Sequence, residues 1–263
     1  MVYSLWLFGF SVLFLVAERF WPQRAQRTLR AGIGTDVFYL IFNSEYLGVL
    51  LGVVAAHTIA VLDRSLDLTN LRDYFCLGAI SGQPLWLQLP ALILIFDFAQ
   101  WLIHNALHRV PWLWEFHKVH HSIQEMDWVG NWRFHWFEVV FYRTLLYVPA
   151  AFFGFSPVAM FWYGVLNTVV GHFAHANLSL RLGPLKYFVN SPEMHIWHHA
   201  HPLSGPADRN FGIMLSVWDW LFGTAYCPQG DPARLGFTGV EWYPKNPISQ
   251  AVAPFLPQRG EKP

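Results

Sequence analysis

The sequence is poor in charge. Only 13% of its 263 residues are charged and 54% are apolar, whereas soluble domains carry roughly 25% charged residues. So few charges are too few to cover a soluble surface, which argues against an ordinary soluble domain. The 17 basic and 17 acidic side chains balance. The basic excess of a nucleic-acid-binding protein is therefore missing, and we predict no nucleic-acid partner.

Cysteine and several metal-binding motifs are also scarce or absent. The two cysteines, Cys76 and Cys227, form no CxxC pair, which excludes a disulfide scaffold, a thiolate zinc site and an iron–sulfur cluster. No ExxH occurs, so the carboxylate site of ferritin-like bundles is excluded. No HExxH occurs either, which counts against a zinc metalloprotease.

Long apolar runs are present instead. They cover residues 2–20, 37–62, 85–103 and 136–170. A bilayer-spanning helix needs roughly 20 apolar residues, so the first three runs each fit one span. The fourth is too long for one span and is broken at 154–157, which predicts two short helices joined by a turn. We predict an all-α integral membrane protein with about four transmembrane helices, or two helical hairpins, and a histidine-rich helical cap.

Basic residues set the expected orientation. The first run lacks the basic start and the cleavage site of a signal peptide, so we expect it to be retained as a span. Arg24, Arg27 and Arg30 follow it with no acidic residue before Asp36. The positive-inside rule then places the 21–35 loop in the cytoplasm and the N-terminus outside. The third run returns the chain to the cytoplasm near His104.

The chain divides into three regions on this interpretation. Residues 1–84 form an N-terminal transmembrane hairpin. Residues 85–226 form a core that carries the histidine motifs and encloses a second membrane hairpin at 136–170. Residues 227–263 are rich in proline and glycine, so we expect an irregular C-terminal tail.

Histidine is the residue in surplus, with 13 copies, most of them clustered. Residues three and four apart share one face of a helix, so each cluster can direct its imidazoles at one point. The clusters are HxxxH (His104, His108), HxxHH (His117, His120, His121), HxxH (His172, His175) and HxxHH (His195, His198, His199). His57 and His201 stand alone, and we expect no ligand role for them.

The clusters predict a metal centre. Neutral imidazole suits zinc, copper, iron and nickel. A zinc site uses three or four ligands, so eight to ten histidines are too many for one ion and suit two. A redox centre is one interpretation. A non-redox membrane metal protein, either a zinc hydrolase or a metal transporter, is the alternative.

Two further residues are predicted to support the ligands. Asp97 lies seven residues before His104, two helical turns away on the same stripe of the third run. A carboxylate inside a membrane span is costly and marks function. We expect it to accept a hydrogen bond from the free N–H of a ligand imidazole. His135 follows the second cluster and is expected to support the site rather than to bind metal.

The order of these motifs resembles the signature region of the fatty acid hydroxylase/sterol desaturase superfamily. The resemblance covers about residues 90–226. The segments that carry it are 97–104, 108–122, 126–127, 133–135, 175–178, 192–199, 210–212 and 218–224. One departure is Asn105, where many members of the superfamily have arginine.

The resemblance implies a membrane enzyme with a cytosolic histidine cap that holds two iron ions, which zinc can replace during purification. Such enzymes use O2 and two electrons to hydroxylate or desaturate a membrane lipid of the sterol or fatty-acyl type. By this resemblance the metal ligands are His104, His108, His117, His120, His121, His172, His175, His195, His198 and His199, supported by Asp97, His135, Asn177 and Asp219.

The resemblance also implies a separate electron donor, because no segment matches a fused cytochrome b5 domain. A cytochrome b5-like protein, or a ferredoxin with its reductase, would serve. We expect Lys118, Arg181, Lys186 and Arg209 to steer an acidic donor to the cap. The short termini, and the absence of a C-terminal KKxx signal, favour a multi-pass protein of the bacterial inner membrane over one of the endoplasmic reticulum.

Overall fold

The computed structural model describes residues 2–69 and 80–256, so Cys76 lies outside the described residues. Within these ranges the only strand-like pairings are two isolated bridges, Pro22–Leu178 and Ala200–Leu235. The helices are α1 (Val2–Phe20), α2 (Ile33–Ile41), the π-helix η1 (Phe42–Tyr46), α3 (Leu47–Thr69), α5 (Leu85–Arg109), α6 (Pro111–His121), η2 (Trp128–Trp132), α7 (Trp136–Phe152), α8 (Pro157–His175), η3 (Gly183–Tyr187), α9 (Pro192–His198), α10 (Val217–Phe222), α11 (Pro247–Val252) and η4 (Ala253–Phe255).

Three of the described helical stretches are long and apolar enough to cross a membrane: Tyr3–Phe20, Ile33–Thr69 and Leu85–Arg109. Many of their apolar side chains point outward, as with Phe8 (70% exposed) and Val53 (64% exposed). A continuous apolar surface of this kind is unfavourable in water but favourable in lipid. The predicted all-α integral membrane fold is confirmed.

The fourth apolar run folds as two helices, as predicted. α7 ends at Phe152, and Gly154 then adopts φ 79°, a left-handed conformation that turns the chain. Ser156 caps α8 by accepting a hydrogen bond from Ala159 N at 3.2 Å, and Pro157 occupies the first turn. These local signals end one helix and start the next.

A π-turn interrupts the second membrane stretch at η1. It directs Asn43 into the protein, where its amide donates to the carbonyls of Trp132 and Phe134, each at 3.0 Å. Backbone carbonyls at the end of η2 and just after it therefore hold η1, which leads into α3, in place. Single π-turns inside helices occur mostly at functional sites, and this one borders the cavity described below.

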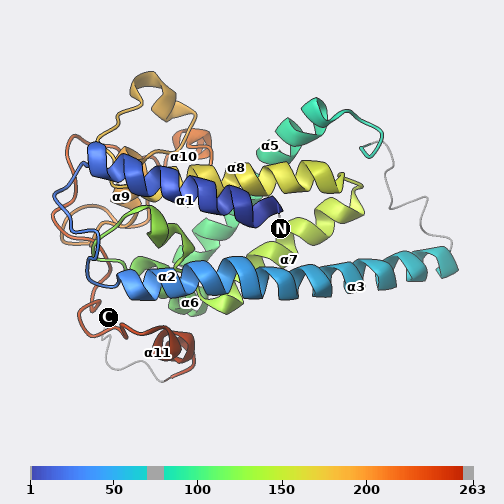
Figure 1. Ribbon diagram of the computed structural model, residues 1–263, viewed down its shortest axis with the longest axis horizontal. Helices are drawn as coiled ribbons and strands as arrows, with labels where there is room; N and C mark the ends of the chain where they lie inside the picture. Colours follow the sequence, from blue (N-terminus) through green and yellow to red (C-terminus); the bar gives the residue numbers. More distant parts are fainter. Residues whose placement is uncertain (1, 70–79, 257–263) are drawn as a thin grey trace.

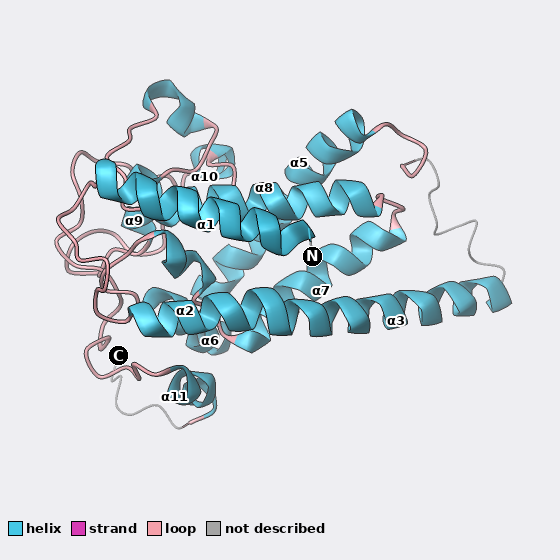
Figure 2. Ribbon diagram, in the orientation of Figure 1, coloured by secondary structure: helices cyan, strands magenta, loops and turns pink. Residues whose placement is uncertain are grey.

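The long helices pack side by side, and α3 extends away from the end that carries α6, α9 and α10 (Figure 1). That end, here called the cap, consists of short helices joined by loops (Figure 2). α1 ends there, α2 begins there and α5 ends there. The loop between α1 and α2 therefore lies on the same side as the histidines, as the positive-inside argument requires.

The apolar core lies between α5, α7 and α8, on the membrane side of the cap. Leu92, Phe96, Leu146 and Tyr163 are buried in it. The rings of Phe96 and Tyr163 meet edge to face, with centroids 5.0 Å apart. This packing fixes α5 and α8 relative to one another, and both helices carry histidines at their cap ends.

A buried ionic network fastens the loop between α1 and α2 to the cap. Arg30 donates to Asp36 at 2.6 Å and to both oxygens of Asp127 at 2.6 and 2.7 Å. Arg133 bonds the other oxygen of Asp36. All four side chains are at most 6% exposed. Burial disfavours the charge of Arg30, but its two carboxylate partners more than offset this and raise its pKa.

Candidate metal centre

The candidate centre is assembled from the ends of four helices. α5 supplies His104 and His108 at its last turns, and α8 supplies His175 as its last residue. α6 ends with the first HxxHH motif, and α9 contains His195 and His198 with His199 as its C-cap. Both begin with proline at the first position, which sets the helical dihedral angle without losing a hydrogen bond.

The structure gathers nine of the ten predicted ligand histidines into two groups, in each of which the potential ligand atoms lie within 4.8 Å of one another. The first group is His104, His108, His117, His121 and His198; the second is His120, His175, His195 and His199. The groups are neighbours, because the rings of His121 and His199 stack with centroids 4.6 Å apart.

Backbone and carboxylate oxygens orient most of these rings through Nδ1. The distances from Nδ1 to oxygen run from 2.7 Å in His198 to 3.2 Å in His120. An acceptor at Nδ1 places the proton there and leaves the Nε2 lone pair free for a metal. The pairs are His104–Phe211 O, His108–Asp208 Oδ1, His117–Glu138 Oε1, His120–Arg133 O, His175–Gly171 O and His198–Arg209 O.

Within each group, Nε2 atoms face one another. In the second group, His120 Nε2 lies 3.2 Å from His175 Nε2, although both rings give their Nδ1 proton to a carbonyl. In the first group, the Nε2 atoms of His104 and His117 lie 3.1 Å apart. Two lone pairs that face each other cannot form a hydrogen bond. A cation between them satisfies both, so the donor set fits a metal in each group.

Burial keeps these histidines neutral. It lowers the pKa of His117, His120 and His121 in α6 well below the usual value, and positive charge on neighbouring histidines would lower it further. The same two causes lower the pKa of His199. Neutral imidazole is the form that binds metal. The cap therefore presents metal-binding imidazoles even in mildly acidic conditions.

Glu138 is a supporting residue that the sequence analysis missed. Its Oε1 accepts from His117 Nδ1 at 2.8 Å, and the side chain is buried. Its Oε2 is buried with no hydrogen-bond partner among the described residues. A signal was available, because Glu138 is the only acidic residue in the 136–170 apolar run. The reasoning applied to Asp97, that a carboxylate in a membrane segment marks function, holds equally for Glu138.

We expect Glu138→Gln to weaken metal binding about 10–100-fold, because an outer carboxylate partner orients the ligand and raises its basicity. The amide keeps the shape but provides a weaker acceptor. Metal affinity, measured by competition with a chelator, checks this. Glu115→Gln is the matched control, since Glu115 pairs with Lys118 at 2.8 Å. Unchanged affinity in Glu138→Gln would show that His117 needs no carboxylate.

The expectation for Asp97 was wrong about its partner. Asp97 accepts from the backbone N–H groups of Met214 and Leu215 at 2.7 and 3.0 Å, and from Trp218 Nε1 at 2.9 Å. Asp97 lies two turns before His104 on α5, about 10 Å away along the helix axis, which is too far for a direct hydrogen bond. The backbone of the loop before α10 lies next to Asp97 instead. Asp97 therefore supports the site indirectly: the loop it holds carries Phe211, whose carbonyl accepts from His104.

Asp219 acts on the same loop from the other side. It accepts from the N–H groups of Phe211 and Gly212 at 2.9 and 2.8 Å, and from Trp101 Nε1 at 3.0 Å. Thr224 donates a fourth hydrogen bond at 2.6 Å. Asp219 is thus connected through Phe211 to the predicted ligand His104.

His135 and Asn177 hold the boundaries of the site. His135 Nδ1 accepts from Phe137 N and caps α7, the helix that carries Glu138. Its Nε2 lies 3.0 Å from the carbonyl of Ala251. Asn177 follows α8 and exchanges two hydrogen bonds of 2.9 Å with the backbone of Arg24. Neither side chain contacts a ligand imidazole through its hydrogen bonds.

His172, which was predicted as a ligand, lies outside both groups. Its Nδ1 faces Asn131 Nδ2 at 3.1 Å, and its ring packs against Trp128 with centroids 5.0 Å apart. Three residues along a helix correspond to a rotation of about 300°, so His172 and His175 differ in direction by about 60°. That difference turns His172 towards η2 and His175 towards the ligands.

A cavity of about 760 Å³ runs from the histidines into the membrane part of the protein. His104, His117, His120, His175 and His195 line its inner end. Apolar residues of α3, α7 and α8 line much of the rest. A cavity of this size holds a small molecule, and its largely apolar lining suits a lipid chain.

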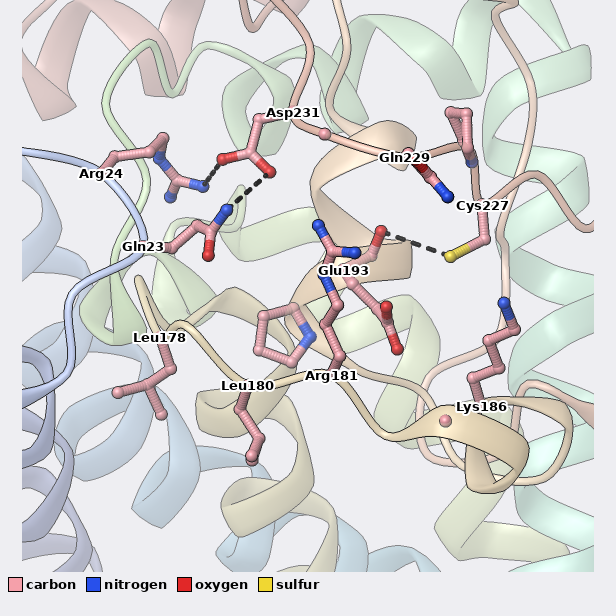
Figure 3. A pocket seen from close by; sticks show the side chains of 14 residues that line it. Gln23, Arg24, Leu178, Leu180, Arg181, Lys186, Glu193, Cys227, Gln229 and Asp231 are labelled. Carbon is pink, nitrogen blue, oxygen red and sulfur yellow. Dashed lines mark hydrogen bonds and ion pairs between the residues drawn. The ribbon is translucent and has the colours of Figure 1, made fainter.

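A smaller pocket of about 200 Å³ lies on the cap surface beside α9 (Figure 3). Arg181, Lys186, Glu193 and Cys227 are among its lining residues, and Cys227 Sγ donates to the carbonyl of Glu193 at 3.7 Å. Glu193 precedes His195 by two residues in α9. The expectation that Lys118 faces a donor was wrong, because Lys118 is buried and bonds Glu115 at 2.8 Å.

Comparison with known proteins agrees with this geometry. The model of the family described as "Fatty acid hydroxylase" matches residues 89–224, just over half of the chain, and all ten predicted ligand histidines fall inside it. No solved structure matches the chain.

Three curated relatives illustrate the similarity. Ornithine lipid hydroxylase OlsE of Rhizobium tropici is 30% identical over 68% of this chain and 53% of its own length. Human alkylglycerol monooxygenase is 25% identical over 61% of this chain and 36% of its own length. A cholesterol 25-hydroxylase-like protein of Danio rerio is 29% identical over 52% and 55%, respectively. The aligned part of the chain thus spans roughly a third to a half of these relatives.

Proposed function

Because the chain belongs to the fatty acid hydroxylase family, we propose that it is an O2-dependent membrane oxidoreductase that hydroxylates or desaturates a lipid at a di-iron centre. The histidines of the first group would hold one ion and those of the second the other. The observation that carries the proposal is the pairing of facing Nε2 lone pairs in both groups, at the inner end of a cavity that leads into the membrane.

The iron pair would supply the redox chemistry that activates O2 with electrons from the donor. The chain's own residues hold the substrate and exclude water. Carbonyls and Glu138 fix the ligand rings through Nδ1, so the centre is preorganised. The apolar cavity walls bring a C–H bond to the centre and keep bulk water from the reacting atoms.

A membrane lipid is the proposed substrate class. The relatives are named for ornithine lipid, alkylglycerol and cholesterol. All of them combine an apolar body with a polar group, and the cavity combines apolar walls with several polar side chains. The names are those of hydroxylases and a monooxygenase, so we favour insertion of oxygen over desaturation.

Electrons would come from a separate donor, a cytochrome b5-like protein or a ferredoxin with its reductase. The surface pocket beside α9 is the proposed docking region, because Arg181 and Lys186 give it basic groups and Glu193, which also lines it, precedes His195 by two residues in α9. The bacterial inner membrane is the proposed location, supported by the similarity to a Rhizobium protein.

The test is untargeted lipid analysis of a bacterial host that expresses the protein, with and without O2. We expect a lipid species that gains one oxygen only when O2 is present, and that is absent with His199→Ala. A species that loses two hydrogens would identify a desaturase of the same class. Zinc-loaded protein with hydrolytic products, or metal uptake without an oxidised lipid, would establish the non-redox alternative and overturn the proposal.

A further inference from the structure

An unpaired arginine lies in the membrane part of the large cavity. Arg143 of α7 lines the cavity with its neighbours Tyr142 and Tyr147. It makes no hydrogen bond or ion pair with any residue that the structure describes. A guanidinium in a membrane segment is costly unless a partner or water satisfies it. Its position beside the candidate centre therefore requires an explanation.

The guanidinium reaches across the cavity towards α3. A Cβ atom placed on Gly48 would lie 3.2 Å from Arg143 Nη1, so the guanidinium passes close to the backbone there. Arg143 follows Glu138 by five residues in α7, about 7.5 Å along the helix axis. Glu138 bonds His117, so Arg143 lies just over one helical turn along α7, on the membrane side, from the carboxylate that supports this predicted ligand.

Other donors on the cavity wall are also unused. Trp132 Nε1 lines the cavity and is buried without a hydrogen-bond partner among the residues described. The hydroxyls of Tyr142 and Tyr147 likewise bond no described residue. Glu45 is the nearby acidic group in η1, but Ser4 Oγ donates to its two oxygens at 3.0 and 3.2 Å, and it forms no ion pair with Arg143 in the described part of the chain. The cavity thus presents a cation and several unused donors. Its unpaired acceptors, Asn43 Oδ1, Asn167 Oδ1 and Glu138 Oε2, do not bond Arg143 in the described part of the chain.

We propose that Arg143 binds an oxyanion of the lipid substrate, a carboxylate or a phosphate, and so selects anionic lipids over neutral ones. The inference rests on the proposed function and specifies its substrate class. Arg143 gives directional, charge-assisted hydrogen bonds to such a group, and these are strong in a cavity shielded from water. A lipid held in this way can extend its chain along the cavity towards the histidines that line it.

Equilibrium binding of four probes that share one chain tests the proposal. Radiolabelled oleate, oleyl phosphate, oleyl alcohol and methyl oleate are added to metal-loaded protein in phosphatidylcholine nanodiscs, without reductant. We expect at least one anionic probe to bind about tenfold or more tightly than the two neutral ones, as a charge-assisted hydrogen bond predicts. An advantage of oleate alone identifies a carboxylate lipid, and an advantage of oleyl phosphate alone a phosphate lipid.

Variants assign the effect to Arg143. In Arg143→Gln the anionic probes should bind no more tightly than the neutral ones, whereas Arg143→Lys should keep part of the affinity difference between them. Arg64→Gln, at an exposed position of α3, is the control and should keep the whole affinity difference. Unchanged metal content in each variant shows that the centre is intact. Equal binding of all probes, or a preference that survives in Arg143→Gln, would overturn the proposal. Because no turnover is measured, this result is independent of whether an oxidised lipid is found.

Discussion

Replacing His199 by alanine is expected to abolish activity and to remove one of two metal ions from each chain. His199 is one of the four histidines of the second group, and its Nε2 lies 3.2 Å from that of His195. Loss of a direct ligand should weaken binding beyond the roughly 10–100-fold cost of losing a supporting partner. His108→Ala should remove the ion of the first group instead. Metal analysis of the detergent-purified protein measures both effects.

Two histidines outside the groups serve as controls. His57 is exposed on α3, and His201 is buried in the cap, where its Nδ1 accepts from Leu203 N. Alanine at either position should leave two ions per chain. His201→Ala also tests whether removal of any buried cap histidine disturbs the fold. A wild-type protein with a single ion, or a His199→Ala variant with two, would contradict the two-group centre.

Replacing Arg30 by methionine is expected to cost about 3–5 kcal/mol of unfolding free energy, because it leaves buried carboxylates without their partner. Asp127 loses both of its short bonds to Arg30, and Asp36 keeps only Arg133. The carbonyl of Arg133 accepts from His120, so the disturbance should reach the second group and lower its metal affinity. Methionine preserves much of the volume, which limits the effect to charge and hydrogen bonding.

Thermal unfolding in detergent, followed by loss of helical signal, measures the Arg30 effect. Arg27→Met is the matched control, because Arg27 is exposed in the same loop. The free energy of unfolding of Arg27→Met should stay within about 0.5 kcal/mol of the wild-type value, as for most surface substitutions. If Arg30→Met were equally mild, the network would be a contact of little energetic consequence, and the α1–α2 loop would have to be held by other bonds.

The spacing of residues along the chain predicted the apolar helices and the histidine clusters. Apolar runs and their breaks are local, and the turn at Gly154 follows from glycine, serine and proline in sequence. The histidine motifs are also local, since residues three and four apart on a helix share a face. The sequence does not define how nine histidines divide between two groups, because that division depends on how α5, α6, α8 and α9 pack.

Errors and omissions arose where a side chain's partner is distant in sequence. Asp97 was assigned to an imidazole because both lie on one stripe of α5, yet its partners lie 117–121 residues away. His172 shares a motif with His175 but faces another helix. Glu138 and Arg143 were overlooked inside an apolar run, although they are its only two charged residues. Charge in a membrane segment was the signal that could have found them.

The Arg30 network also bears on the order of biosynthesis. Asp36 and Asp127 receive bonds from residues 97 positions away in the sequence. A chain made from its N-terminus delivers the first two membrane stretches before Asp127 and Arg133 emerge from the ribosome. Until then Arg30 and Asp36 have only each other, at the edge of the bilayer. Arg30 and Asp36 cancel in charge, but the bonds of Arg30 to Asp127 and of Arg133 to Asp36 can form only after the cap has been translated. The loop between α1 and α2 therefore reaches its final hydrogen bonding late in synthesis.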